Sequence, residues 1–185
     1  AGLLPPDVRV RRIAPAHPDF DARFAALSRS YRFRIADNPE AADPLRRHEV
    51  LWWPRPLAVE PMAQAAPALL GEHDFIAFCK RREGATTIRR VLAAGVDRTV
   101  AGLVEVSLTA DAFCHHMVRS IVGALVEVGE GRRTPQWFGQ LLERTDRQSD
   151  VPVLPPRGLT LERVDYPADE DLAARVGEAR AKRGE

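Results

Sequence analysis

Alternating apolar and polar side chains predict a series of β-strands along this chain. The clearest signal lies within residues 20–35, where Tyr31, Phe33 and Ile35 alternate with polar side chains. A period of two places successive side chains on opposite faces of a sheet, so this stretch is expected to form a half-buried strand. Similar alternation, or a short apolar run, predicts further strands at 8–13, 50–53, 88–97, 103–109 and 159–166.

Apolar residues that recur every three or four positions predict helices between these strands. The strongest candidate spans 115–128, and another spans 60–70, with Pro61 in its first turn and Gly71 after its end. Thr134 followed by Pro135 is typical of a cap and a first helical position, and predicts a third helix. Weaker signals predict a short helical piece at 73–78 and a charged, helical tail at 169–183.

The order of these elements favours an α+β fold. The turn at 100–102 indicates an antiparallel hairpin between the strands on either side of it. We therefore expect a mostly antiparallel sheet with helices packed on one face. The domain is expected to span residues 1–167, followed by a charged C-terminal tail at 168–185.

Composition favours a globular protein with a core of useful size. The 185 residues are 45% hydrophobic and 29% charged, and no run of 18 apolar residues predicts a membrane span. Cys79 and Cys114 are the two cysteines, which is fewer than a small secreted disulfide scaffold carries. We therefore expect two free thiols in a reducing cytoplasm.

The basic residues are unevenly distributed, and nearly all of them are Arg. Residues 1–100 hold 16 Lys and Arg against 12 Asp and Glu, whereas residues 101–185 hold 11 against 14. Arg accounts for 25 of the 27 basic residues. A guanidinium group binds phosphate through paired donors and stacks on bases, which favours RNA as a partner. A GC-rich genome would produce the same excess of Arg, so the composition alone leaves both explanations open.

Four motifs follow one another along the chain. The most distinctive reads AFCHHMVRSIVG over residues 112–123. The others are DARFAA at 21–26 with RSYRF at 29–33, LGEHDFIAF at 70–78 with TIR at 87–89, and RGLTL at 157–161 with VDY at 164–166. In this order and spacing, across residues 3–167, they resemble the second half of the TruA family of tRNA pseudouridine synthases.

The resemblance implies half of a pseudouridine synthase fold and an isomerase that converts uridine to pseudouridine in the anticodon stem-loop of tRNA. An aspartate is the nucleophile in this family, so neither a metal nor another cofactor is expected. That aspartate lies in a GRTDAGVHA motif, which we expect in an N-terminal segment absent from this chain, and the isolated chain is expected to be inactive. Asp146 is not a match, because Arg147 and Gln148 follow it in place of Ala and Gly.

Three residues are candidates for the site. Arg119 falls at the margin of the apolar face of the helix predicted at 115–128, where a guanidinium can bind a carboxylate with two donors. The resemblance implies that Arg119 orients the catalytic aspartate, that Tyr31 contacts the target base and that Leu159 lines the pocket. By residue type alone they could equally be a surface Arg, a half-buried strand Tyr and a core Leu.

The resemblance also implies tRNA as a partner, a homodimer, a cytoplasmic location and no attachment to a membrane. Basic side chains could bind the phosphates of the tRNA, although basic loops are often merely solvated. Two alternatives remain for the isolated chain, namely a non-catalytic RNA-binding module and a dimerisation domain. The candidates for phosphate contact are Arg23, Arg29, Lys80, Arg81, Arg82, Arg89 and Arg90.

Two pairs of adjacent residues that include histidine could be mistaken for a metal site or a catalytic site. His115 and His116 are adjacent, so on a helix they point about 100° apart and cannot easily share a metal ion. We interpret them as hydrogen-bonding residues at the start of a helix. His73 and Asp74 could be a catalytic pair, but an Asp before an apolar segment is more typical of a cap.

Overall fold

The computed structural model describes residues 4–80, 86–146 and 150–181. The chain divides into two compact units, of which the larger spans Ala26–Tyr166. The smaller contains the N-terminal residues up to Ala25 and the C-terminal residues from Pro167 onwards. None of the helices described has both the length and the apolar character that crossing a bilayer requires.

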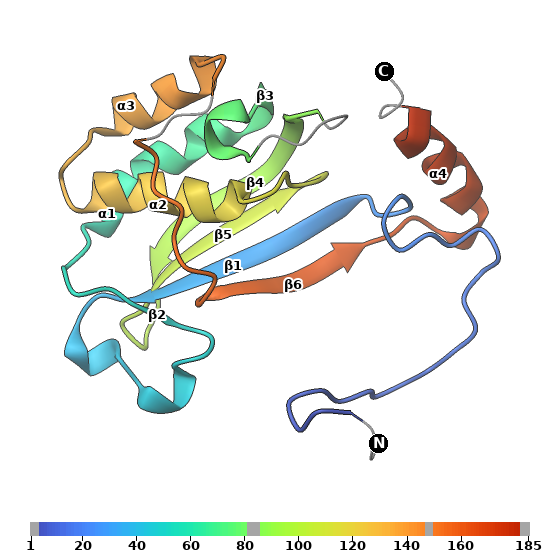
Figure 1. Ribbon diagram of the computed structural model, residues 1–185, viewed down its shortest axis with the longest axis horizontal. Coiled ribbons are helices and arrows are strands. Elements are labelled where there is room, and N and C mark those ends of the chain that lie inside the picture. Colours follow the sequence, from blue (N-terminus) through green and yellow to red (C-terminus); the bar gives the residue numbers. More distant parts are fainter. Residues whose placement is uncertain (1–3, 81–85, 147–149, 182–185) are drawn as a thin grey trace. The chain divides into compact units, whose positions relative to one another are not determined.

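The larger unit is built on a six-stranded sheet in which β1 (Ser28–Ala36) pairs with three other strands. β1 pairs antiparallel with β5 (Val104–Ala110) on one side. On its other side it pairs with β6 (Leu159–Asp165), and its last two residues pair parallel with β2 (Leu51–Trp52). β4 (Ile88–Arg98) and β3 (Gly71–Asp74) extend the sheet beyond β5 in antiparallel pairs. The expected, mostly antiparallel sheet is confirmed (Figure 1).

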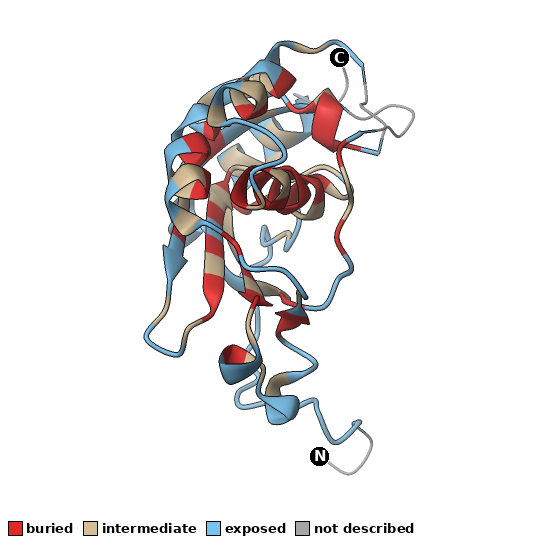
Figure 2. Cartoon of the chain, turned by 90° about the vertical axis from the view of Figure 1, so that its left-hand side faces the viewer, coloured by how far each residue is buried: buried red, intermediate tan, exposed pale blue. Residues whose placement is uncertain are grey.

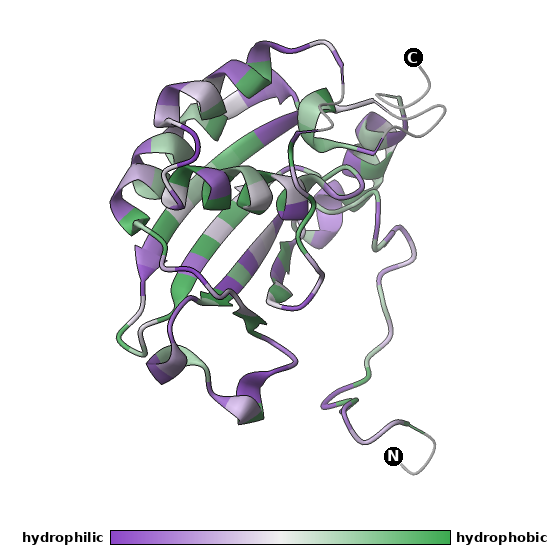
Figure 3. Cartoon of the chain, turned by 60° about the vertical axis from the view of Figure 1, so that its left-hand side comes forward, coloured by the Kyte–Doolittle hydropathy of each residue, from purple (hydrophilic) through white to green (hydrophobic). Residues whose placement is uncertain are grey.

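Helices α1 (Val59–Ala65), α2 (Met117–Gly129) and α3 (Pro135–Gln140) cover one face of this sheet (Figure 1). α2 is the central helix, because 11 of its 13 residues are buried. The residues coloured as buried gather on this helix and on the strands beside it (Figure 2). Alternating hydropathy is visible along the strands (Figure 3), and β1 turns Phe33 and Ile35 into the core as the sequence predicted.

Three segments differ from the sequence prediction. The helix expected at 60–70 changes into the 3₁₀ turn η3 (Ala66–Leu69), because Pro67 has no N–H to continue α-helical hydrogen bonding. The helical piece expected at 73–78 is shortened to the 3₁₀ turn η4 (Ile76–Phe78), because the residues before Phe75 pair with β4. Residues 8–13 are exposed and lie in no strand, because no strand of the described residues pairs with their backbone.

The smaller unit holds the C-terminal helix and the residues that contact it around the Phe24 ring. α4 (Leu172–Ala181) confirms the helix that was predicted for the tail. The Arg180 guanidinium of α4 lies 5.4 Å from the centre of the Phe24 ring and 3.5 Å from the Asp21 carboxylate. Asp21 also accepts hydrogen bonds from the backbone N–H groups of Arg23 and Phe24, both at 2.8 Å. Helix α4 is therefore joined to the end of the N-terminal segment.

Two carboxylates stabilise the larger unit from within. Burial opposes the charge on Asp37, but hydrogen bonds from Arg98 and from the backbone of Leu57 outweigh it and lower the pKa of Asp37. Burial likewise opposes the charge on Glu130, but hydrogen bonds from Arg55 and Trp53 lower its pKa. The Asp37 and Glu130 carboxylates thus bind the segment around Trp53 to Leu57, which lies between β2 and α1.

We expect the protein to lose stability in acid because of these carboxylates. A carboxyl group whose pKa is lowered by folding contributes stability above its unfolded pKa of about 4, and this contribution disappears as the pH falls through the folded value. Urea unfolding at about pH 7, 5, 4 and 3 should give a free energy of unfolding that is nearly constant at first and then falls below about pH 4. A free energy that stays constant or rises between about pH 5 and 3 would contradict this assignment.

Candidate active site

A hollow of about 410 Å³ opens beside the N-terminal end of α2. Its walls come from Tyr31 on β1, from residues 113–119 leading into α2, and from Pro156 and Leu159 at the start of β6. The hollow therefore brings together three segments that are far apart in the sequence. It contains all three of the residues predicted to form the site, namely Arg119, Tyr31 and Leu159.

Arg119 lies in the first turn of α2 and is half-buried. Its Nε donates a hydrogen bond to the carbonyl of Leu154, and its own carbonyl accepts one from the Leu154 N–H. These two bonds fix the side chain against the segment before β6. Among the described residues its terminal nitrogens have no hydrogen-bond acceptor, so the two-pronged end of the guanidinium is available to a carboxylate.

Close packing holds the segment opposite Arg119 in place. A Cβ atom added to Gly123 would lie 2.0 Å from the Pro152 carbonyl oxygen, so the chain passes directly over α2 at this point. Gly158 has φ +93°, and a Cβ atom there would lie 2.5 Å from the Arg34 carbonyl oxygen. Gly123 leaves room for the chain at Pro152, and Gly158 leaves room for the turn before Leu159. The segment from Pro152 to Gly158 can therefore bring Leu159 to the wall of the hollow.

Tyr31 presents its ring to the hollow from the face of β1 that carries the core residues. Phe113 packs edge-on against it, with ring centres 5.1 Å apart and planes at 86°. This arrangement is a favourable one for two aromatic rings, and it restricts the tilt of the Tyr31 ring. Sequence analysis did not select Phe113, although its place at the start of the AFCHHMVRSIVG motif was a usable signal.

His115 and His116 form the turn from which α2 begins. Their rings stack with centres 4.0 Å apart, and both residues line the hollow. His116 has φ +72°, and its carbonyl accepts the N–H of Ser120, but its side chain does not cap the helix. In the part of the chain that the structure describes, no three His, Cys, Asp or Glu side chains are grouped to bind a metal ion.

The candidates for phosphate contact do not form one group. Arg29 donates to the carbonyl of Asp111, and the backbone N–H of Lys80 donates to the carbonyl of His115, so both lie close to the segments that line the hollow. Arg89 bonds to carbonyls at the start of its own strand, and Arg90 lies 3.3 Å from the Glu72 carboxylate. Arg23 belongs to the smaller unit. Arg81 and Arg82 lie outside the described residues.

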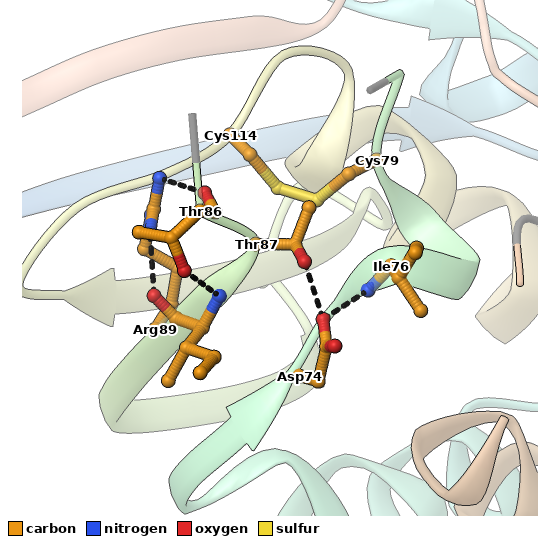
Figure 4. Close-up of a disulfide and its surroundings, with 8 residues drawn as sticks. Asp74, Ile76, Cys79, Thr86, Thr87, Arg89 and Cys114 are labelled. Carbon is orange, nitrogen blue, oxygen red and sulfur yellow. Dashed lines mark hydrogen bonds between the residues drawn. A yellow bond between two sulfur atoms is a disulfide. The ribbon is translucent and has the colours of Figure 1, made fainter. Parts of the chain in front are cut away.

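Asp74 and Asp146 lie outside the hollow. Asp74 accepts hydrogen bonds from the backbone of Ile76 and the hydroxyl of Thr87, so it stabilises the turn that leads into η4 (Figure 4). Its capping role was predicted in outline, although the element it leads into is a single 3₁₀ turn. Asp146 is exposed and is not among the lining residues.

The prediction of two free thiols is wrong. Cys79, after η4, and Cys114, before α2, form a disulfide with Cα atoms 5.8 Å apart (Figure 4). The next residue of each segment takes part in the hydrogen bond from Lys80 to His115. The number of cysteines alone did not reveal that these two segments lie side by side.

Reduction of this disulfide is expected to lower the free energy of unfolding by about 2–4 kcal/mol, because a cross-link restricts the unfolded chain. The cysteines are 35 residues apart, so the closed loop is long. Urea unfolding with and without dithiothreitol measures the difference. A Cys79→Ser, Cys114→Ser variant is the control and should have the lower stability in both buffers. Equal midpoints for the unmodified chain in the two buffers would contradict the expectation.

Comparison with known proteins gives a consistent result. A family model described as tRNA pseudouridine synthase matches residues 65–167, which is more than half of the chain. The chain belongs to the tRNA pseudouridine synthase family. That match includes Arg119 and Leu159, whereas Tyr31 precedes it.

Relatives within the tRNA pseudouridine synthase family extend the similarity over nearly the whole chain. The tRNA pseudouridine synthase A of Frankia casuarinae is 56% identical over 182 residues, which cover 98% of this chain and 66% of the relative. That of Streptomyces avermitilis is 53% identical over 183 residues, covering 99% and 64%. That of Cutibacterium acnes is 48% identical and covers 98% and 66%. The chain therefore spans about two thirds of the length of these curated relatives.

Proposed function

We propose that this chain provides the uridine-binding part of a tRNA pseudouridine synthase that acts on the anticodon stem-loop. The observation that carries the proposal is the convergence of Tyr31, Arg119 and Leu159 on one hollow. The nucleophilic carboxylate comes from a segment outside this chain. Membership of the family supports the reaction, and the arrangement of the hollow supports the division of roles.

The reaction requires the protein to bind the uridine and to orient it, and it involves no net oxidation or reduction. The bond between the sugar C1′ and uracil N1 breaks, the base rotates, and C1′ forms a bond to C5. N1 gains a proton and C5 loses one, so atoms and electrons balance without an oxidant. A carboxylate that attacks the nucleoside divides the exchange into smaller steps. The target base must first leave the base stack and enter a pocket.

Each residue of the hollow has a role in this scheme. The guanidinium of Arg119, held by Leu154, binds the nucleophilic carboxylate through its free terminal nitrogens and keeps it ionised. The ring of Tyr31, supported by Phe113, lies against the uracil. Leu159 provides an apolar wall that excludes water from the base while it is detached.

Basic side chains near the hollow position the RNA backbone in this proposal. Arg29 and Lys80 are the best placed, because both belong to segments that contact the lining residues. Arg23, Arg81, Arg82, Arg89 and Arg90 remain candidates for more distant phosphates. Binding of a polyanion through such side chains should weaken strongly as salt is added.

Mapping of pseudouridine in tRNA tests the proposal. Carbodiimide labelling is compared between a strain with the complete gene and a strain from which it has been deleted, and then after the gene is restored. Loss of anticodon-arm pseudouridine on deletion and its return on restoration is the expected result. Unaltered anticodon-arm pseudouridine in the deletion strain would contradict the proposal.

The location and assembly of the protein are part of the same proposal. We infer a homodimer in the cytoplasm, where the tRNA substrate is found, and sedimentation of the purified protein tests the dimer. Subcellular fractionation tests the location, and recovery of the protein in the fraction that contains the tRNA is the expected result. Recovery of the protein only in other fractions would contradict this location.

A further inference from the structure

A second hollow, of about 370 Å³, lies at the C-terminal end of β1, whereas Tyr31 lies near the middle of that strand. It is formed between the end of β1, the strand β2 and the 3₁₀ turn η2 (Pro44–Arg46), in the segment drawn in pale blue to cyan in Figure 1. Its floor is apolar, with Ala36, Val50 and Leu51 buried. None of the residues that line it takes part in the reaction proposed above.

Two neighbouring tryptophans differ in their surroundings. Trp53 donates its indole N–H to Glu130 at 2.7 Å and has the guanidinium of Arg55 over its ring, so it belongs to the folded framework. Trp52 lines the second hollow and is 48% exposed. The alternation of β2 turns Leu51 into the core and Trp52 outward. An exposed indole beside a hollow offers a flat surface on which a base can stack.

Two arginines line the same hollow as this indole, Arg47 and Arg157. Among the described residues neither forms an ion pair, and Arg47 donates a hydrogen bond to the Pro44 carbonyl at 3.1 Å. Arg46, by contrast, pairs with Glu49 at 2.6 Å. Asp43 also lines the hollow, but its carboxylate accepts the N–H of Leu45 at 2.8 Å and caps η2. The hollow thus combines an aromatic surface with two positive charges, which is the chemistry of a nucleotide site.

The two hollows are neighbours along the chain. Pro156 and Leu159 line the first hollow, and Arg157 lines the second, so the same short segment separates them. On β1, Tyr31 lines the first and Ala36 the second. Tyr31 and Ala36 are five residues apart, roughly 17 Å along β1, and an odd separation puts them on opposite faces of the sheet. A few nucleotides of single-stranded RNA that pass around the edge of the sheet can reach both hollows.

We propose that the second hollow is a subsite for a further nucleotide of the same RNA, in which a base stacks on Trp52 and the adjacent phosphates bind Arg47 and Arg157. The proposal rests on the proposed function, because it assumes that single-stranded RNA enters the first hollow. Any base can stack on an indole, so the subsite increases the affinity for RNA and fixes the orientation of the bound strand without selecting a base sequence.

Binding of a fluorescein-labelled anticodon stem-loop RNA to this chain tests the subsite. Trp52→Leu is expected to raise the Kd roughly 5- to 100-fold, the range that corresponds to the stacking of one base. Trp137→Leu is the control, because Trp137 is another partly exposed tryptophan, but it lies on α3 and does not line the second hollow. It should leave the Kd within about 2-fold of the unmodified chain.

A second variant tests the same subsite in case Trp52→Leu weakens RNA binding only because it disturbs the fold. Arg47→Ala combined with Arg157→Ala is expected to reduce the slope of log K against log salt by between about one and two, since two phosphate contacts are lost. An unmodified chain that binds the RNA, with Kd and salt slope unchanged in both variants, would overturn the subsite while leaving the proposed function intact. An unmodified chain that does not bind the RNA at all would instead reject the RNA-binding role of the chain and the subsite with it.

Discussion

Replacing Arg119 with alanine should lower the kcat of pseudouridine formation at least about 100-fold, in an active protein that contains this chain and the nucleophile. The guanidinium is anchored through Nε to Leu154, so its terminal nitrogens are directed by the fold. Without them the carboxylate loses a two-pronged partner that fixes its position and its charge. Affinity for tRNA should change little, because most of it comes from phosphate contacts elsewhere.

Two further variants distinguish orientation from folding. Arg119→Lys keeps the charge but loses the planar fork, so its kcat should lie between those of the unmodified protein and the alanine variant. Arg163→Ala is the matched control, because Arg163 is an exposed guanidinium on β6 that pairs with Asp165 at 2.7 Å. A kcat for Arg119→Ala within about 3-fold of the control, with the same thermal midpoint, would show that Arg119 does not orient the nucleophile.

Replacing Asp37 with alanine should lower the free energy of unfolding by about 2–3 kcal/mol, because it removes charged hydrogen bonds to Arg98 and leaves the backbone N–H of Leu57 without its acceptor. The Asp37 side chain is 2% exposed and accepts two hydrogen bonds of 2.8 Å from Arg98. It also accepts the backbone N–H of Leu57 at 2.8 Å. One carboxylate therefore joins the end of β1, the end of β4 and the segment that leads into α1.

A pair at the surface provides the comparison for Asp37. Glu72 and Arg90 lie 3.3 Å apart with both side chains more than half exposed, so Glu72→Ala should cost less than about 1 kcal/mol. Urea unfolding of both variants measures the difference. If the Asp37 variant lost no more stability than the Glu72 variant, the carboxylate would not have the structural role assigned to it.

Much of the fold could be predicted because its main elements are specified locally. β5 alternates along its whole length and β1 alternates from Tyr31 to Ile35, and α2 has buried residues on nearly every side, as expected of a central helix. β3 could not be predicted, because Gly71–Asp74 has no apolar alternation and is a strand only where β4 provides a partner. The same limit applies to residues 8–13, which have the pattern of a strand but pair with no strand in the part of the chain that the structure describes.

The site was predictable only in part, for a related reason. Motif resemblance selected Arg119, Tyr31 and Leu159, and the fold brings them to one hollow. Phe113 and the bond between Cys79 and Cys114 were missed, since both depend on contacts between distant segments. Trp52 was missed because a short apolar run ahead of a proline predicts a buried strand, and the outward turn of one of its residues depends on the pairing of β2 with β1.

Photo-crosslinking with 4-thiouridine tests the central claim most directly. Anticodon stem-loops carrying one 4-thiouridine, placed at each uridine position in turn, are irradiated with this chain, and the linked peptides are identified by mass spectrometry. At one position the crosslink should fall on the walls of the first hollow, at Tyr31, within 113–119 or at Pro156 to Leu159. Crosslinks confined to other segments at every position would show that the target uridine does not enter this hollow.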